Sequence, residues 1–300
     1  MNKPPIRVST ISQAHKLREL PPPSHPFISI IETSEIKSVP NISVVLDFYM
    51  ISIKRNCNTL SYGQQKYDFD EGVMSFVAPN QIISGQDHDS DTRPVGWILL
   101  VHPDFFWGTP LAKKIKKYDY FGYAVNEALF LSQKEEAIIN AIGENIKLEC
   151  NSNIDQFSQD IIISHLETFL NYAERFYQRQ FITRKITNHQ LLDRLDKLLS
   201  DYFNSDDLAL KGLPTVQYIS DNLNISSKYL GSMLKQLTGL TTQQHIHEKL
   251  IAKAKEKLSL TEMSVSEIAY GLGFEHLQSF SKLFKAKTKL TPMEFRDSFN

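Results

Sequence analysis

The same arrangement of helix caps and apolar residues occurs twice in the last third of the chain, about fifty residues apart. In the second copy, Ser264 is followed three residues later by Glu267, a capping box that satisfies the first free backbone donors of a helix. Apolar residues recur at helical spacing until Gly273 ends that helix: Val265, Ile268, Ala269 and Leu272. The next helix has a stripe suited to burial, made of Leu277, Phe280, Leu283 and Phe284. Its outward face therefore carries Gln278, Ser281, Lys282 and Lys285.

The first copy follows the same order. A short helix with Val216, Ile219 and Leu223 leads into a turn at Asn224 and Ile225, and Ser226 is suited to cap the helix after it. The residues of that helix expected to face inward are Leu230, Met233, Leu234 and Leu237, with Gly239 at its end. The residues expected to face a partner are Ser227, Lys228, Gly231, Ser232 and Lys235. Between the two copies, Thr242 to Leu258 reads as one helix, roughly 25 Å long.

Each copy has the form of a helix-turn-helix, in which the second helix lies in the major groove of DNA. A rigid spacer of this length suits two recognition helices that enter successive major grooves, about 34 Å apart. The alternative is an inert helical domain, because any small helical domain needs buried Leu, Ile and Phe. The charge distribution favours DNA: residues 211–300 hold 12 Lys and Arg against 8 Asp and Glu, and residues 1–210 hold 21 against 26. The expected DNA contacts are Ser227, Lys228, Gly231, Ser232, Lys235, Leu277, Gln278, Ser281, Lys282 and Lys285.

The segment AYGLGFEHLQSFSKLFKAKTKLTPMEFR, from Ala269 to Arg296, resembles the DNA-binding domain of the AraC/XylS family of transcription regulators. The resemblance covers roughly the last third of the chain. It implies a reader in which one chain contacts an asymmetric DNA site, with RNA polymerase as a further partner. It also implies a cupin-like β-barrel in the N-terminal half, which binds a small effector, and helices that pair two chains into a homodimer in a bacterial cytoplasm.

The chain departs from this family pattern on the first recognition helix. Gly231 and Ser232 stand where family members often carry long polar or basic side chains, and a glycine inside a helix costs about 1 kcal/mol relative to Ala. We therefore expect the first helix to read few bases, with Lys228 and Lys235 holding phosphates. Lys249, on the spacer helix, replaces an Arg that is common in the family, and we assign it no role beyond the helix surface.

The N-terminal half has a different pattern, with short β-rich runs separated by turn residues. These runs are Phe27 to Glu32, Val44 to Lys54, Gln65 to Phe69, Val73 to Val77 and Val95 to His102. Their spacing predicts a small antiparallel sandwich or barrel and does not choose between the two. Its aromatic residues line an effector pocket or fill a core: Phe48, Tyr49, Tyr67, Phe76 and Trp97.

Two helices are expected between residues 132 and 182. The first begins with a capping box at Ser132 and Glu135 and has a stripe of Ile138, Ile139, Ile142 and Ile146. The second keeps helical spacing at Ile162, Leu166, Phe169, Leu170, Ala173, Phe176 and Tyr177. The two helices either cover the chain's own β-domain or pair with those of a second chain, and the resemblance favours pairing.

An enzyme of the cupin type is the third alternative, since such barrels also house metal centres. The histidines of the β-rich half, His15, His25, His88 and His102, lack paired ligand spacing, so no cofactor is expected. His245 and His247 point in different directions on a helix, and the pair of glycines at 271 and 273 follows no strand, so neither indicates a metal or phosphate site. The run of lysines from Lys113 to Lys117 is interpreted as a solvated helix face.

Length and composition complete the prediction. Three hundred residues with 41% hydrophobic content suit two globular domains, and no run of about eighteen apolar residues indicates a membrane span. The two cysteines, Cys57 and Cys150, are expected as isolated thiols, with a redox pair as the alternative. We predict an α+β chain with a β-rich domain over 1–185 and an all-α reader over 190–300, whose parts span about 215–238, 242–258 and 265–288. The predicted function is effector-controlled transcription regulation, and the alternative is a regulator whose N-terminal half is a protein-interaction module.

Overall fold

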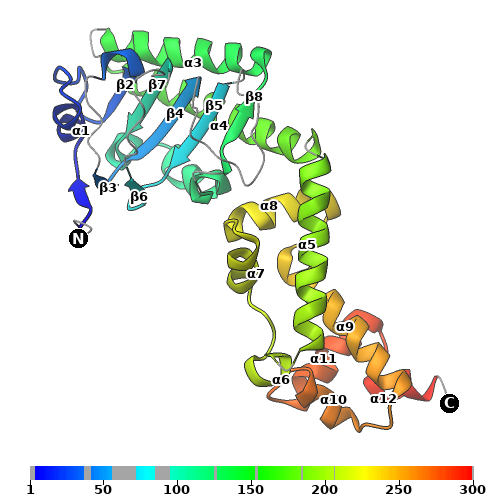
Figure 1. The fold of residues 1–300 in the computed structure, drawn as a ribbon. Coiled ribbons are helices and arrows are strands. Elements are labelled where there is room, and N and C mark those ends of the chain that lie inside the picture. The colour runs from blue at the N-terminus through cyan, green and yellow to red at the C-terminus, as the bar shows by residue number, and fades with distance from the viewer. Residues whose placement is uncertain are drawn as a thin grey trace. The chain divides into compact units, whose positions relative to one another are not determined.

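The computed structural model describes residues 4–36, 42–55, 72–84, 95–124, 127–152, 155–183, 185–205 and 207–298. The chain divides into two compact units, Met1–Gln180 and Phe181–Asn300. The first is β-rich with two long helices and the second is helical, so the chain is α+β (Figure 1). Among the described helices, none is both long and apolar enough to cross a membrane.

The first unit contains two sheets. The larger has strand order β2-β7-β4-β5-β8, formed by Ile28–Glu32, Val95–Val101, Tyr49–Arg55, Gly72–Val77 and Leu129–Leu131, and all its neighbours are antiparallel. The smaller has the order β1-β3-β6, from Ile6–Val8, Ser43–Leu46 and Ile82–Ser84. Strand β1 pairs in parallel with β3, so the expectation of a wholly antiparallel domain is wrong. The expected strand at Gln65 to Phe69 lies outside the described residues, as do Cys57, Tyr67 and His88.

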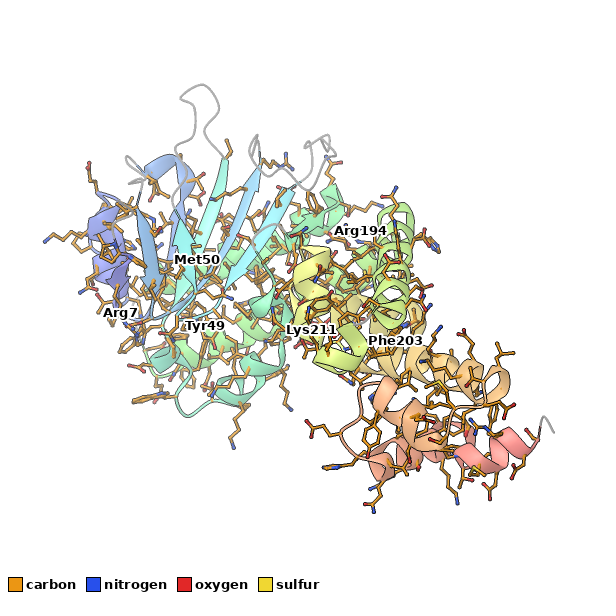
Figure 2. All side chains as sticks on the ribbon, turned by 60° about the horizontal axis from the view of Figure 1, so that its bottom comes forward. Arg7, Tyr49, Met50, Arg194, Phe203 and Lys211 are labelled. Atoms are coloured by element: carbon orange, nitrogen blue, oxygen red, sulfur yellow. The ribbon has the colours of Figure 1, made fainter. Side chains whose placement is uncertain are left out.

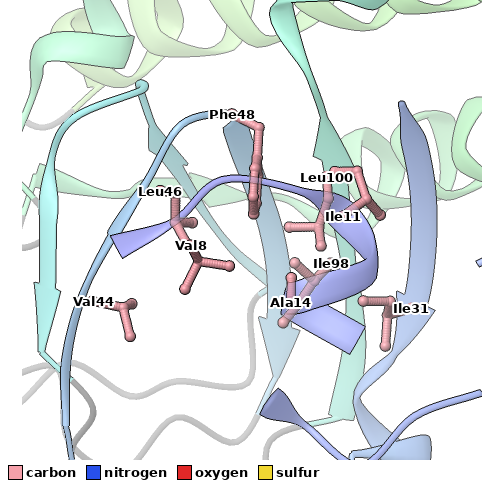
Figure 3. Packing of buried hydrophobic residues seen from close by; sticks show 9 residues of the cluster. All are labelled: Val8, Ile11, Ala14, Ile31, Val44, Leu46, Phe48, Ile98 and Leu100. Atoms are coloured by element: carbon pink, nitrogen blue, oxygen red, sulfur yellow. The ribbon is translucent and has the colours of Figure 1, made fainter. Parts of the chain in front are cut away.

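The core of this unit lies between the two sheets. It contains residues from both sheets and from helix α1 (Ile11–Leu17), namely Val8, Ile11, Ala14, Ile31, Val44, Leu46, Phe48, Ile98 and Leu100 (Figure 3). The expected single run from Val44 to Lys54 is divided into β3 and β4, which belong to different sheets. The break falls at Asp47, which forms an ion pair of 2.6 Å with Arg7, and at Phe48, which is fully buried.

The opposite face of the larger sheet is covered by helices. Successive side chains of strand β4 point to opposite faces of the sheet. Tyr49 packs against Phe106 and Phe121, whereas Met50 packs against the core between the sheets (Figure 2). The residues around Tyr49 come from η2 (Pro103–Phe106), α2 (Leu111–Lys114), η3 (Ile115–Lys117) and η4 (Asp119–Gly122). Of the lysines in that region, Lys113, Lys116 and Lys117 are exposed, while Leu111 and Ile115 are buried.

Helices α3 (Gln133–Asn151) and α4 (Ser158–Thr183) complete this layer. The capping box at Ser132 and Glu135 is present. The whole apolar stripe of α4 is buried, and it meets the chain's own sheet, where Phe169 packs on Trp97 and Tyr177 on Phe76. The predicted stripe of α3 is correct except at Ile138, which is 36% exposed. On the same helix, burial raises the pKa of the Cys150 thiol to about 12.

The second unit consists of α5 (Lys185–Asn204), α6 (Asp207–Lys211), α7 (Val216–Leu223), α8 (Ser227–Thr238), α9 (Thr242–Leu260), α10 (Val265–Gly271), α11 (Leu277–Thr288) and α12 (Pro292–Asp297). Helix α5 contacts α6, α7 and α9, and it was not predicted. Arg194 of α5 donates a hydrogen bond to the carbonyl of Leu223, at the end of α7 (Figure 2). The predicted spacer helix is present as α9 and is two residues longer than expected.

Candidate DNA-binding surface

The first helix pair, α7 and α8, is fixed by caps at each junction. The hydroxyl of Thr215 accepts a hydrogen bond from the Tyr218 amide at 3.0 Å, and that of Ser226 accepts one from the Tyr229 amide at 3.1 Å. Asn224 ends α7 in the left-handed conformation, which Asn tolerates better than most residues. Leu230, Met233 and Leu234 are fully buried, so the inward face of α8 agrees with the prediction at these positions.

The second pair, α10 and α11, has the same order of helix, turn and helix, but α11 starts after His276, which forms no side-chain cap hydrogen bond. The amide of Ser264 donates to the Glu267 carboxylate at 2.7 Å, and the Glu267 amide donates to the Ser264 hydroxyl at 3.2 Å, so the predicted capping box is present. Hydrogen bonds with the Ser264 side chain and backbone lower the pKa of Glu267. In α11, Phe280 and Phe284 are fully buried and pack against each other at 5.7 Å between ring centroids.

The two copies also share the junction that follows each recognition helix. Thr238 donates to the Leu234 carbonyl and Thr288 to the Phe284 carbonyl, both at 2.8 Å. A capping box then starts the next helix, with Thr241 and Gln244 at α9 and with Thr291 and Glu294 at α12. The copies differ at the left-handed residue between these features, which is Gly239 in the first copy and Lys289 in the second. The internal repeat is therefore structural and extends beyond the turns.

On α8, the residues expected to face a partner are unequally placed. Lys228 and Lys235 are exposed, whereas Gly231 and Ser232 are half-buried. Ser227 departs from the expectation: its hydroxyl is hydrogen-bonded to the Ser220 hydroxyl at 2.7 Å and to Gln217 at 3.2 Å. Its side chain thus contributes to the contact between α7 and α8. The exposed face of α8 is consequently short of side chains that reach outward.

On α11, the exposed face is richer. Gln278, Lys282 and Lys285 are exposed and follow one another at helical spacing, and Leu277 and Ser281 are half-buried beside them. Ser279 and Lys287 are also exposed, and they were not among the predicted contacts. The sequence does indicate their exposure, because both are polar residues close to the buried phenylalanines of α11. The second recognition helix therefore presents more hydrogen-bonding and cationic groups than the first.

The spacer helix is packed rather than free. Ile246, Leu250, Ala254 and Leu258 of α9 are buried. Lys249 is half-buried and lines a depression between α5 and α9, together with Ser200, Phe203 and Asn204. Arg296 of α12 donates to the carbonyls of Leu258 and Met263, which ties the end of α9 to the second helix pair.

Other candidate sites in the described residues do not form. No group of three or more His, Cys, Asp or Glu side chains in that part of the chain is placed to hold a metal ion. His15 is a buried core residue, whose Nδ1 donates to the Pro21 carbonyl at 2.6 Å and whose Nε2 lies 2.9 Å from the Ser29 hydroxyl. The Nε2 atom of His245 lies 2.9 Å from the Thr238 hydroxyl, and the Nε2 atom of His247 lies 3.1 Å from the Gln243 side-chain amide nitrogen. These histidines are structural.

A family of known domains matches the tandem helix pairs, and individual known proteins match most of the chain. A family described as "Helix-turn-helix domain" matches residues 219–298. The HTH-type transcriptional activator RhaS of Escherichia coli O81 is 36% identical over 261 residues, which cover 83% of this chain and 85% of that protein. The activator of the same name from Salmonella dublin is 24% identical over 264 residues, with the same coverage. The C-terminal domain of the response regulator yesN from Fusobacterium nucleatum is 29% identical, covers 35% of this chain and 95% of that chain, and has a TM-score of 0.31.

The match to the Escherichia coli activator runs through both units, and the tandem helix pairs carry the geometry of a DNA reader. The chain is therefore a DNA-binding transcription regulator and belongs to the AraC/XylS family.

Proposed function

We propose that α8 and α11 enter successive major grooves of double-stranded DNA and that α11 is the principal reader of sequence. The observation that carries this proposal is the repeat of one capped helix pair on both sides of α9, with the polar exposed face concentrated on α11. A 19-residue helix such as α9 is about 28 Å long, close to the separation of successive grooves on one face of the duplex.

The chemistry of α11 suits base contacts. The amide of Gln278 has a donor and an acceptor side by side, and it matches the N6 and N7 edge of adenine in the major groove. Lys282 and Lys285 lie one and two turns further along the same face, where an ammonium group contacts guanine or phosphate oxygens. Both lysine side chains are exposed, and Lys285 interacts electrostatically with the Glu294 carboxylate of α12.

The chemistry of α8 suits positioning. Lys228 and Lys235 are the exposed cations at its two ends, and Gly231 between them has no side chain that could contact a base. Phosphate contacts fix the register of a protein on the duplex without specifying sequence. We therefore assign α8 mainly to the DNA backbone, with few base contacts, and expect a weaker base preference in the half of the site under α8 than in the half under α11.

A binding selection on a randomised duplex library separates the two roles. We expect Gln278→Ala to relax base preference in one half of the site, since a bidentate contact discriminates by about 1–3 kcal/mol. Lys228→Ala is expected to weaken binding by a similar factor on matched and mismatched duplexes. Gln236→Ala is the control, because Gln236 is an exposed glutamine of α8 outside the proposed face. An unchanged sequence logo for Gln278→Ala, or a larger change for Lys228→Ala, contradicts the assignment.

For the first unit, we propose a cupin-like domain that binds a small effector and controls the reader. The two facing sheets and the α4 layer support this proposal, as does the likeness to the activators named above, which extends into this half of the chain. Pairing of two chains is proposed through the outward face of α3, where Ile138 and Leu148 are 36% and 66% exposed. Contact with RNA polymerase and a cytoplasmic location are carried by the family resemblance alone.

An effector-independent interaction module is the second candidate, and one observation favours it. A cavity between the larger sheet and the helices, lined by Tyr49, Phe106, Leu111 and other apolar residues, has a volume of about 10 Å³, which is room for one water molecule. A thermal-shift titration of residues 1–185 with fractionated cell metabolites distinguishes the candidates. A fraction that raises the unfolding temperature supports effector binding, and no shift in any fraction supports the interaction module.

A further inference from the structure

We propose that a backbone contact between Gly273 and the loop after α6 fixes the separation of the two helix pairs and thereby sets the spacing of the DNA elements that the chain accepts. This inference rests on the proposed function, since it requires that both recognition helices contact DNA. Gly273, Gly212 and Tyr202 are positioning residues in this proposal and do not contact DNA.

The contact joins backbone to backbone. Gly273 lies in the turn between α10 and α11 with φ +80°, and a Cβ placed on it would stand 2.6 Å from the Leu208 carbonyl oxygen and 2.8 Å from the Gly212 Cα. Leu208 and Gly212 are joined by their own hydrogen bond of 3.2 Å, from the Gly212 amide to the Leu208 carbonyl. Leu208 is 2% exposed and Leu272, beside Gly273, is fully buried. Neither side of the contact is a flexible side chain that could move aside.

The loop that meets Gly273 is anchored to the first helix pair. The hydroxyl of Tyr202, on α5, donates to the Gly212 carbonyl at 2.9 Å. The ring of Tyr202 packs edge-on against Tyr218 of α7, with 5.1 Å between centroids. Arg194 bonds to the carbonyl of Leu223 at the other end of α7. Helix α5 is therefore anchored to the first helix pair. Through Gly212, the loop after α6 contacts the turn between α10 and α11 of the second pair.

The two helix pairs are consequently joined at two places, by α9 and by the contact at Gly273. Helix α9 packs against α8, α10 and α12, and the contact at Gly273 is a further one that lies away from the α9 axis and limits the remaining bending and rotation between the two pairs. One base pair inserted between two DNA elements moves the second element by about 3.4 Å and turns it by about 35°. A rigid pair of recognition helices cannot follow that displacement, whereas a hinged pair follows part of it.

The test compares two glycines that share a conformation but not a neighbourhood. Gly273→Ala strains the left-handed turn and also forces the Leu208 and Gly212 backbone away. Gly239→Ala is the matched control, because Gly239 has φ +76° and nothing within 4 Å of an added Cβ. Tyr202→Phe removes the hydrogen bond to the Gly212 carbonyl, keeps the ring that packs on Tyr218, and changes no residue of the second helix pair. All three are made in the full chain, and calorimetry establishes that each variant is folded.

The probe is a duplex selected from a randomised library by the wild-type chain, together with derivatives that have one base pair inserted or deleted between its two elements. We expect wild type and Gly239→Ala to lose about tenfold or more in affinity on either derivative, because the few base contacts of one helix fall out of register and each mismatched base pair costs about 1–3 kcal/mol. Folded Gly273→Ala is expected to lose less than about threefold on the same derivatives, while binding the selected duplex more weakly than wild type.

The outcomes are separable. A folded Gly273→Ala chain that keeps the wild-type spacing penalty overturns the inference, and so does an equal loss of that penalty in Gly239→Ala. If Gly273→Ala does not fold, Tyr202→Phe decides: a reduced spacing penalty supports the inference, and an unchanged penalty overturns it. If the selected duplex has one element, or wild type is indifferent to spacing, the proposed function fails, and the inference fails with it.

Discussion

Gly231→Ala should stabilise the second unit. Gly231 lies inside α8, and a Cβ added there would have no atom within 4 Å, so the substitution removes backbone freedom of the unfolded chain without a clash. A glycine inside a helix costs about 1 kcal/mol relative to Ala, which gives the expected gain of roughly 0.5–1 kcal/mol. For a unit of roughly 120 residues, this corresponds to a rise of about 2–4 °C in its unfolding temperature.

The matched comparison is Gly143→Ala on α3. There, an added Cβ would lie 2.7 Å from Cζ2 of Trp97, and that indole is 6% exposed and held by its hydrogen bond to Asn140 at 3.0 Å. Overpacking costs about 1–3 kcal/mol, which exceeds the helix-propensity gain. Calorimetry of the full chain follows the transition of each unit. A lower unfolding temperature of the second unit in Gly231→Ala, or a higher one of the first unit in Gly143→Ala, would refute the reasoning that the space around the added Cβ decides the sign of the effect.

Three further predictions concern the second unit. A fragment of residues 181–300 should bind the selected duplex with an affinity that falls as salt rises. A shorter fragment of residues 190–300 should unfold at a lower temperature, because it lacks Phe181, which packs on Tyr229 with 5.2 Å between ring centroids. Equal unfolding temperatures of the two fragments would contradict this role of Phe181. Hydrogen bonds lower the pKa of Glu267 and Glu294 from the ordinary 4.5, so their stabilisation is present above that value and lost as pH falls through the lowered pKa. Glu267→Gln combined with Glu294→Gln should flatten acid unfolding curves in this range, and unchanged curves would argue against the caps as its source. Lys289→Gly should stabilise the unit by about 1 kcal/mol, since Lys289 has φ +69°, and a denaturant midpoint that falls would contradict the strain.

The second unit was predictable where its structure depends on neighbours in sequence. A cap joins a side chain to an amide two or three residues away, so Ser264 and Thr215 act through atoms that the sequence itself places nearby. Helix α5 was missed although Leu191, Leu195 and Leu199, all buried, recur four residues apart. The pattern was present in the sequence, but no helix was predicted there.

The first unit was less predictable because its pairings join distant residues. Strand β1 aligns Ile6 with Val44, and the break after β3 is held by Arg7, forty residues away from Asp47 in sequence. No local pattern specifies such a partner. The same limit applies on the DNA-binding surface, where Ser227 is turned toward Ser220 of α7 by a hydrogen bond that helical periodicity does not reveal.

Each copy of the helix pair has a residue that works against stability. In α8 it is Gly231, a glycine within the helix, and after α11 it is Lys289, a side chain in the left-handed conformation where the first copy has Gly239. Functional surfaces are where local rules are broken without a compensating contact. On the proposed function, the missing side chain at Gly231 would let the α8 backbone approach DNA closely, and Lys289 adds a cation beside α11. The proposed division between a positioning helix and a reading helix is consistent with the difference between the two copies at these two sites.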